Sequence, residues 1–310
     1  MNKVERIVFA VVISLVSIMF FGCDASSGSV TINMTDAPAD DLNIKEVNIT
    51  VTGIGYHLGD LETEDSWVNI DFETPKEYNL LDLTGGTTEM LGEFTFPSGI
   101  ITQLRFFLEA PEEPETVSGT PSNPGCYLVL EGETELDTDD VEEALFVPSG
   151  SNSGFKAVGE FEVPVNGAVT ITADFDVRKS VRKTGGGMYK LQPTIRLIAE
   201  DISGDIEGTV EYTGDNVPVV FAYEDGTYNI SELEADNEGL AFPEAVSSFS
   251  ITDTDEDGFL DYTLAFLALG TYDLIFVELD AAGVYIADSV NIEEDVILSG
   301  ETATLDFVFP

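Results

Sequence analysis

The chain has 310 residues, of which 43% are hydrophobic and 10% aromatic, and 59 acidic against 12 basic residues give it a formal charge of −47. This hydrophobic content excludes a chain that is disordered throughout, and the length allows two domains of ordinary size. A surface this acidic repels nucleic acid and anionic lipid headgroups, which excludes nucleic acid as a partner, and it attracts cations such as Ca²⁺.

The N-terminal segment has the charge and hydropathy pattern of an export signal. Lys3 and Arg6 precede an uninterrupted run of apolar or small residues, Ile7–Phe21. A helix of this length spans about 22 Å, which is short for a membrane crossing but typical of the core of a signal peptide. Residues 1–22 therefore predict a signal peptide, and the alternative is an uncleaved anchor helix.

The end of the apolar run indicates a lipid anchor. Gly22 and Cys23 resemble the bacterial lipobox, whose cysteine receives a diacylglyceryl group, although Phe20 and Phe21 depart from the residues usual there. Several acyl chains on one cysteine give stable anchoring, which one short chain does not. We therefore expect a lipidated Cys23 and a short tether (residues 23–29) to attach the protein to a membrane of the bacterial cell envelope, facing the periplasm or the exterior.

Residues 30–200 consist of short alternating segments separated by turn residues, which is typical of strands. In the clearest segment, residues 168–177, five apolar residues alternate with four polar ones. The apolar set is Val169, Ile171, Ala173, Phe175 and Val177, and the polar set is Thr170, Thr172, Asp174 and Asp176. A period of two predicts one buried and one solvent-exposed face, as in an antiparallel sheet. Helical periodicity is scarce, and only "LLDLTGGTTEML" favours a short helical turn.

Several motifs in this region together resemble a known family. They are "SVTINMTDAPADD", "VNITVTGIGYH", "WVNI", "YNLLDL", "FPSGIITQLRFFL", "VPSGSNSGFK", "ADFDVRKSV" and "YKLQPTIRLI". In this order they are similar to the DUF4382 domain, a domain of unknown function in bacterial exported proteins and lipoproteins, over about residues 28–200. The acidic insertion at 109–125 and Ile100-Ile101 depart from the pattern. The resemblance implies an exported, β-rich domain over residues 30–200 and does not imply a reaction.

A second β pattern follows the segment "AEDISGDIEGTV". A "TDxDG" turn precedes a strand, and "LALGTY", Leu267–Tyr272, precedes the next one. This arrangement resembles a prealbumin-like or carboxypeptidase-regulatory-like sandwich. We therefore expect residues 201–310 to form a second domain, so that the whole chain is all-β, with two antiparallel β-sandwich-type domains after the signal peptide.

The stretch "DTDEDGFLD" is a candidate calcium loop. In an EF-type loop the ligands would be the side chains of Asp253, Asp255 and Asp257, the backbone carbonyl of Phe259, and Asp261. Leu264 stands where such a loop has a bidentate glutamate, and the flanking residues predict strands, which excludes a complete EF-hand. Ca²⁺ is therefore a possible, weakly bound ligand. The alternative is an inter-strand turn in which Gly258 takes a positive φ.

Six of the twelve basic residues lie within nineteen positions. They are Arg178, Lys179, Arg182, Lys183, Lys190 and Arg196. Such a basic patch could bind an envelope glycan, a lipid headgroup or a protein partner. The alternative is a hairpin around residues 185–187 whose cations pair with acidic neighbours in individually weak ion pairs.

The remaining reactive residue types predict no catalytic site. His57 is the sole histidine, which makes a hydrolytic triad improbable, and Asn152 stands where a G-x-S-x-G loop has its nucleophile. Cys126 has no disulfide partner once Cys23 is lipidated, and it predicts a buried, unreactive thiol. We expect a non-enzymatic lipoprotein with a binding or structural role and an unknown ligand. The alternatives are an envelope hydrolase or carbohydrate-active enzyme that uses paired carboxylates, and a calcium-stabilised spacer or adhesion module.

Overall fold

The computed structural model of the protein describes residues 26–37, 43–58, 67–109, 125–132, 140–147, 154–234, 240–253 and 258–310. Strands dominate these residues, so the all-β prediction is confirmed. The elements of the N-terminal unit are β1 (Ser27–Ala37), β2 (Ile44–Leu58), β3 (Trp67–Asn79), η2 (Leu80–Leu83), β4 (Glu89–Pro97), β5 (Gly99–Leu108), β6 (Tyr127–Leu130), β7 (Val141–Phe146), β8 (Phe155–Val158), β9 (Phe161–Val163), β10 (Ala168–Asp176), α3 (Val177–Ser180), β11 (Val181–Lys183), β12 (Tyr189–Leu191) and β13 (Ile195–Ala199). The elements of the C-terminal unit are β14 (Ser203–Glu211), β15 (Val217–Glu224), η4 (Ile230–Leu233), β16 (Ser247–Ser250), β17 (Leu260–Ala268), β18 (Gly270–Leu279), η5 (Ala287–Ser289), β19 (Asn291–Leu298), β20 (Thr302–Thr304) and β21 (Phe307–Val308), and η3 (Glu200–Ile202) connects the two units.

The N-terminal unit is one mixed sheet that curls around a single core. Its order is β11-β12-β7-β6-β2-β5-β8-β13-β10-β1-β4, with β3 added to β2 and β9 to β5. Strands distant in this order touch across the core. The rings of Tyr56 on β2 and Phe96 on β4 stack with centroids 4.2 Å apart, and Phe106 on β5 meets Phe175 on β10 edge-on at 5.3 Å. The curl therefore brings both halves of the sheet onto the same apolar side chains.

The polar face of β10 is buried, which differs from the sequence expectation. Thr172 exposes none of its surface and Asp174 only 8%. The hydroxyl of Thr172 donates to a carboxylate oxygen of Glu200 at 2.7 Å, and a carboxylate oxygen of Asp174 lies 2.7 Å from a guanidinium nitrogen of Arg196. A strand can be buried on both faces when its polar groups have such partners. The prediction of a strand here is confirmed, and that of a solvent-exposed polar face is wrong.

The C-terminal unit is a β-sandwich. One sheet has the order β17-β14-β20, with β21 also on β14, and the other has the order β16-β15-β18-β19. Between them, Phe276 on β18 stacks on Phe307 of β21 with centroids 4.0 Å apart and meets Tyr262 of β17 edge-on. The outer face of the second sheet is also covered, because Phe221 on β15 stacks on Phe242 at 4.2 Å. The central strands β15 and β18 are therefore buried on both faces.

Among the described strands, five pairs run parallel, although the sequence predicted antiparallel sheets. They are β1 with β10, β7 with β12, β8 with β13, β14 with β20 and β14 with β21. The alternation of residues along one strand describes its own two faces and carries no information about the direction of its neighbour.

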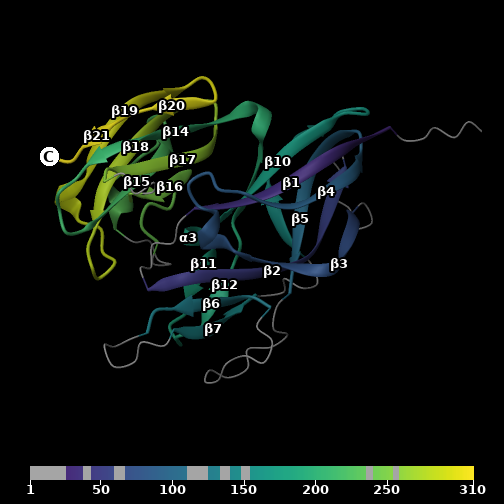
Figure 1. The fold of residues 1–310 in the computed structure, drawn as a ribbon, viewed down its shortest axis with the longest axis horizontal. Helices are drawn as coiled ribbons and strands as arrows, with labels where there is room; N and C mark the ends of the chain where they lie inside the picture. The colour runs from purple at the N-terminus through teal and green to yellow at the C-terminus, as the bar shows by residue number, and fades with distance from the viewer. Residues whose placement is uncertain are drawn as a thin grey trace, which may run out of the picture.

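The two units lie side by side along the longest axis of the molecule (Figure 1). β1 begins at one end of this axis, and the C-terminal unit, with β19 and β21, lies at the opposite end. Within the described residues, no helix combines the length and hydropathy that a bilayer crossing requires. The predicted domain boundary at residue 200 concerns independent folding and stays a prediction.

Candidate functional site

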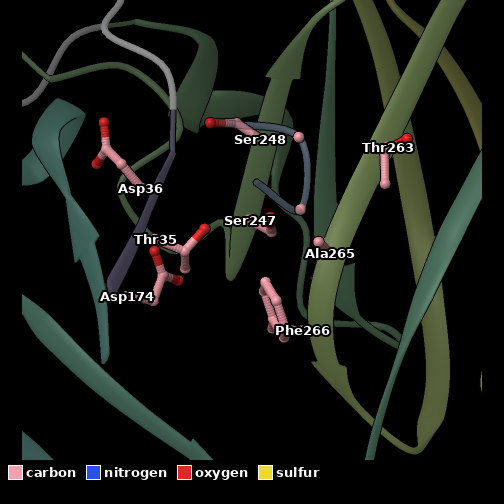
Figure 2. Close-up of a pocket in the computed structure, with 10 residues that line it drawn as sticks. Thr35, Asp36, Asp174, Ser247, Ser248, Thr263, Ala265 and Phe266 are labelled. Carbon is pink, nitrogen blue, oxygen red and sulfur yellow. The ribbon is translucent and has the colours of Figure 1, made fainter. Parts of the chain in front are cut away.

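A narrow polar cleft lies where the two units meet. About 270 Å³ of space, part of it open solvent, lies between its walls, which are formed by Thr35, Asp36, Gly85, Gly86, Asp174, Ser247, Ser248, Thr263, Ala265 and Phe266. Figure 2 shows Thr35 and Asp174 next to each other, as expected for cross-strand partners on β1 and β10, with Ser247 and Ser248 presented by β16. Between these walls the cleft leaves room for roughly one water molecule.

The two carboxylates of the cleft are engaged in holding the fold. Asp36 is 6% exposed and accepts a hydrogen bond from the backbone N–H of Val177 at 2.9 Å. Asp174 accepts from two nitrogens of Arg196, at 2.7 and 3.2 Å. Burial raises the pKa of Asp174, and the neighbouring guanidinium of Arg196 opposes that rise. Both groups thus act as acceptors for protein donors.

A short helical turn, α3, connects these carboxylates to the C-terminal unit. Its N-cap is Asp176, whose side chain accepts from the backbone N–H of Lys179 at 3.0 Å, a common way to satisfy the first amides of a helix. The turn directs Arg178 and Lys179 at the segment that follows residue 240.

Arg178 and Lys179 form a clasp between the units. The two terminal nitrogens of Arg178 donate to the backbone oxygens of Ala241, at 2.6 Å, and Phe242, at 2.9 Å. The ammonium group of Lys179 donates to the backbone oxygen of Ala245 at 2.6 Å. Arg178 is only 5% exposed, and its guanidinium lies 5.1 Å from the ring centre of Phe221, a distance typical of cation–π contact.

The turn after η2 adds a second contact between the units. Gly85 has a φ of +63°, and a Cβ atom there would lie 2.8 Å from the ring of Phe249 on β16. A Cβ atom on Gly86 would lie 3.3 Å from the Cβ of Ala265 on β17. The "TGG" stretch thus supplies both the left-handed backbone and the close approach that glycine permits.

The six residues of the predicted basic patch lie in different surroundings. Arg178 and Lys179 contact the C-terminal unit, and Arg196 pairs with Asp174. Arg182 and Lys190 are cross-strand partners on the hairpin of β11 and β12, and Lys183 on that hairpin lies 5.1 Å from the ring centre of Tyr189. The buried Arg178 therefore contributes to the contact between the units and not to an exposed patch.

The cleft also bears on the alternative of a hydrolase with paired carboxylates. A glycosidase needs one carboxyl group that acts as an acid and another that acts as a nucleophile or base on either side of a sugar ring. Asp36 and Asp174 line the same cleft, but each accepts hydrogen bonds from the protein, and the space between the walls does not admit a sugar ring. We therefore interpret the cleft as the seam between the units.

The predicted calcium loop is described only at its ends. The backbone groups of Thr252 and Asp261 exchange hydrogen bonds of 3.2 and 2.7 Å, and Asp253 accepts from the N–H of Gly258, whose φ is +94°. These contacts are typical of a turn between β16 and β17. Asp255 and Asp257 lie outside the described residues, and Phe259 is 62% exposed. Within the described residues, no cluster of three or more His, Cys, Asp or Glu is arranged to hold a metal, so weak calcium binding stays a prediction.

A calcium titration of the thermal midpoint tests this loop. With a dissociation constant of about 1 mM, as in extracellular modules, about 10 mM Ca²⁺ stabilises the folded state by roughly 1.4 kcal/mol. We expect a rise in midpoint of a few degrees that Asp255→Ala abolishes. Equal midpoints in calcium and in chelator, or an equal rise in the variant, would contradict calcium binding by this loop and support the inter-strand turn.

The remaining candidate reactive residues of the sequence are either buried or outside the described residues. Cys126 is fully buried, its thiol donates to the backbone oxygen of Glu109 at 3.2 Å, and burial raises its pKa to about 12. His57 on β2 is 1% exposed, near Trp67. Cys23 and Asn152 lie outside the described residues. A buried thiol with so high a pKa is unreactive at neutral pH.

Comparison with solved structures finds matches at very low similarity. They include a putative adhesin from Bacteroides ovatus (12% identity, 89% of this chain and 88% of that chain, TM-score 0.21), the major pilin of Streptococcus pyogenes (13%, 92% and 98%, 0.18) and the tip fimbrial protein Mfa3 of Porphyromonas gingivalis (8%, 88% and 83%, 0.23). The chain spans 33% of the Bacillus anthracis TIE protein and 26% of a leucine-rich repeat protein from Bacteroides thetaiotaomicron. TM-scores this low carry no argument about function.

Comparison by sequence gives a firmer result. No curated protein matches the chain. Residues 27–193 match the model of a family described as "Domain of unknown function (DUF4382)". Because the matched residues make up more than half of the 310, the protein belongs to the DUF4382 family.

Proposed function

We propose that the protein is a non-enzymatic lipoprotein of the bacterial cell envelope, anchored through a lipid on Cys23 and acting as a binding or structural module. The C-terminal unit is the part held farthest from the membrane. The ligand is a molecule or surface outside the anchoring membrane.

One observation carries the proposal. Cys23 lies only four positions before Ser27, where β1 starts, and β1 begins at the end of the long axis opposite the C-terminal unit (Figure 1). Four extended residues reach at most about 14 Å. A lipid on Cys23 would therefore hold the N-terminal unit next to the bilayer and present the C-terminal unit outward.

The contacts between the units support a display role. Arg178 and Lys179 bond three backbone oxygens of the C-terminal unit, and the glycine turn at 85–86 packs against β16 and β17. Units joined in this way transmit the orientation of the tether to the outer unit, whereas units joined by one flexible linker would not.

The experiment that tests the proposal is Cys23→Ser in the full chain, expressed in a bacterium fed with labelled palmitate. We expect complete loss of the label and a shift of the protein from the membrane to the soluble fraction, because serine provides no thiol for the acyl-carrying group. The matched control is Cys126→Ser, which removes the other thiol and should keep the label. Unchanged labelling of Cys23→Ser would refute the proposal.

A further inference from the structure

The part of the N-terminal unit where β1 begins is built from two turns that flank the chain. We call it the tether end, and its residues are Ser26–Ser27, Pro97–Ile100 and Pro164–Gly167. The backbone N–H of Ser98 donates to the backbone oxygen of Ser26 at 2.7 Å, and the N–H of Asn166 donates to that of Ser27 at 2.9 Å. The hydroxyls of Ser26 and Ser98 are also hydrogen-bonded. These bonds fix both turns beside the point where the chain enters the fold.

Each of these turns exposes a large aliphatic side chain. Ile100 is 54% exposed and Val165 is 62% exposed. Ile100 lies two residues after Ser98, which is hydrogen-bonded to Ser26, and Val165 lies one residue before Asn166, which is hydrogen-bonded to Ser27. Transfer of an exposed aliphatic side chain from water into an apolar or interfacial environment is favourable, and here two such side chains lie on either side of the incoming chain.

The charges around the tether end indicate which kind of lipid headgroup it would contact. Neither lysine nor arginine occurs in residues 26–29, 93–101 or 160–168. Glu162 on β9 is the cross-strand partner of Ile100 on β5. A polybasic contact with anionic lipids is therefore absent from these segments. Exposed aliphatic residues, serine hydroxyls and few carboxylates suit the zwitterionic headgroup region instead.

We infer that the tether end is a membrane-contact surface, in which Ile100 and Val165 enter the interface of a zwitterionic bilayer beside the lipid anchor. The inference rests on the proposed function, because the membrane is identified as the partner from the proposed lipid on Cys23. Ser27 lies four positions after Cys23, so an extended chain keeps it within about 14 Å of the anchored cysteine. Both turns are hydrogen-bonded to Ser26 or Ser27 and therefore lie beside this point. The acyl chains supply the affinity, and the two side chains supply the orientation, with the C-terminal unit pointing away from the membrane.

The experiment uses the full, acylated chain in phosphatidylethanolamine and phosphatidylcholine vesicles that contain quencher-labelled lipids. Single cysteines at Ile100→Cys and Val165→Cys carry an environment-sensitive fluorophore. The controls are Ile297→Cys and Val308→Cys, which are similarly exposed at 67% and 59% but lie on β19 and β21 at the opposite end. Cys126 is buried and Cys23 is blocked by lipid, so only the introduced thiols react.

We expect severalfold stronger quenching at positions 100 and 165 than at 297 and 308. Equal quenching at all four positions of an acylated, vesicle-bound chain would overturn the inference and leave the proposed function intact. Energy transfer between fluorophores on two copies labelled at 100 or 165, without quenching by lipid, would assign this end to a dimer contact and would also overturn the inference. A chain whose mass shows no acyl group would refute the proposed function, and the inference with it.

Discussion

We expect Arg178→Ala to lower the free energy of unfolding by about 2–4 kcal/mol. The substitution removes both donors from the backbone oxygens of Ala241 and Phe242, which lie in the seam between the units. A buried acceptor left without a donor costs about 1–3 kcal/mol, and the loss is partly offset because a desolvated charge is no longer buried. The shortened side chain also leaves a gap beside the ring of Phe221.

Urea unfolding followed by circular dichroism measures this effect. The matched control is Lys190→Ala on the β12 hairpin strand, which we expect to change stability by no more than about 0.5 kcal/mol. Arg178→Lys should lose part of the stability, because one ammonium group does not reproduce the planar fork that serves two carbonyls. The clasp would be contradicted if Arg178→Ala cost no more than the control.

The second large effect is expected at the centre of the C-terminal sandwich. Phe276 is fully buried, stacks on Phe307 at 4.0 Å and meets Tyr262 edge-on at 5.6 Å. Replacing a phenylalanine in such surroundings with alanine removes its transfer free energy and leaves a cavity, which together cost about 3–5 kcal/mol. We expect Phe276→Ala to destabilise the chain by that amount.

Thermal and urea unfolding of Phe276→Ala should be compared with Ile297→Ala, whose side chain lies on β19 and is 67% exposed. The exposed substitution should cost less than about 0.5 kcal/mol. Similar losses for both variants would mean that the two sheets of the C-terminal unit do not enclose the core described above.

Much of the strand content was predictable because it depends on local pattern. The apolar positions of β10 predicted which of its residues face the core, and "LALGTY" located the turn between β17 and β18, which the structure places at residue 269. The short helical turn in "LLDLTGGTTEML" is η2. Each of these features is specified by residues that are neighbours in the chain.

The burial of the polar face of β10 was not predictable in the same way. Thr172 and Asp174 alternate with apolar residues, as on any solvent-exposed face, and their partners Glu200 and Arg196 lie more than twenty residues away. Hydrophobic periodicity shows where the apolar residues lie, but it does not reveal whether a polar residue faces water or a distant partner.

The clasp was missed for a related reason. Arg178 and Lys179 were visible as members of a basic cluster, but the groups that they bind are backbone oxygens at 241, 242 and 245. Every residue type carries such an oxygen, so no sequence motif marks an acceptor. The local signal that was available is the capping residue Asp176 before "VRKS", which indicates a helical turn that orients the two cations.

The central claim, a lipid anchor on Cys23, is tested most directly by the mass of the N-terminal tryptic peptide of the protein isolated from bacterial membranes. The account predicts a peptide from Cys23 to Lys45, the first lysine or arginine after the cysteine, that carries a diacylglyceryl group on the thiol. Residues 1–22 should be absent from the isolated protein. A peptide that ends at Lys45, begins before Cys23 and carries an unmodified thiol would contradict it.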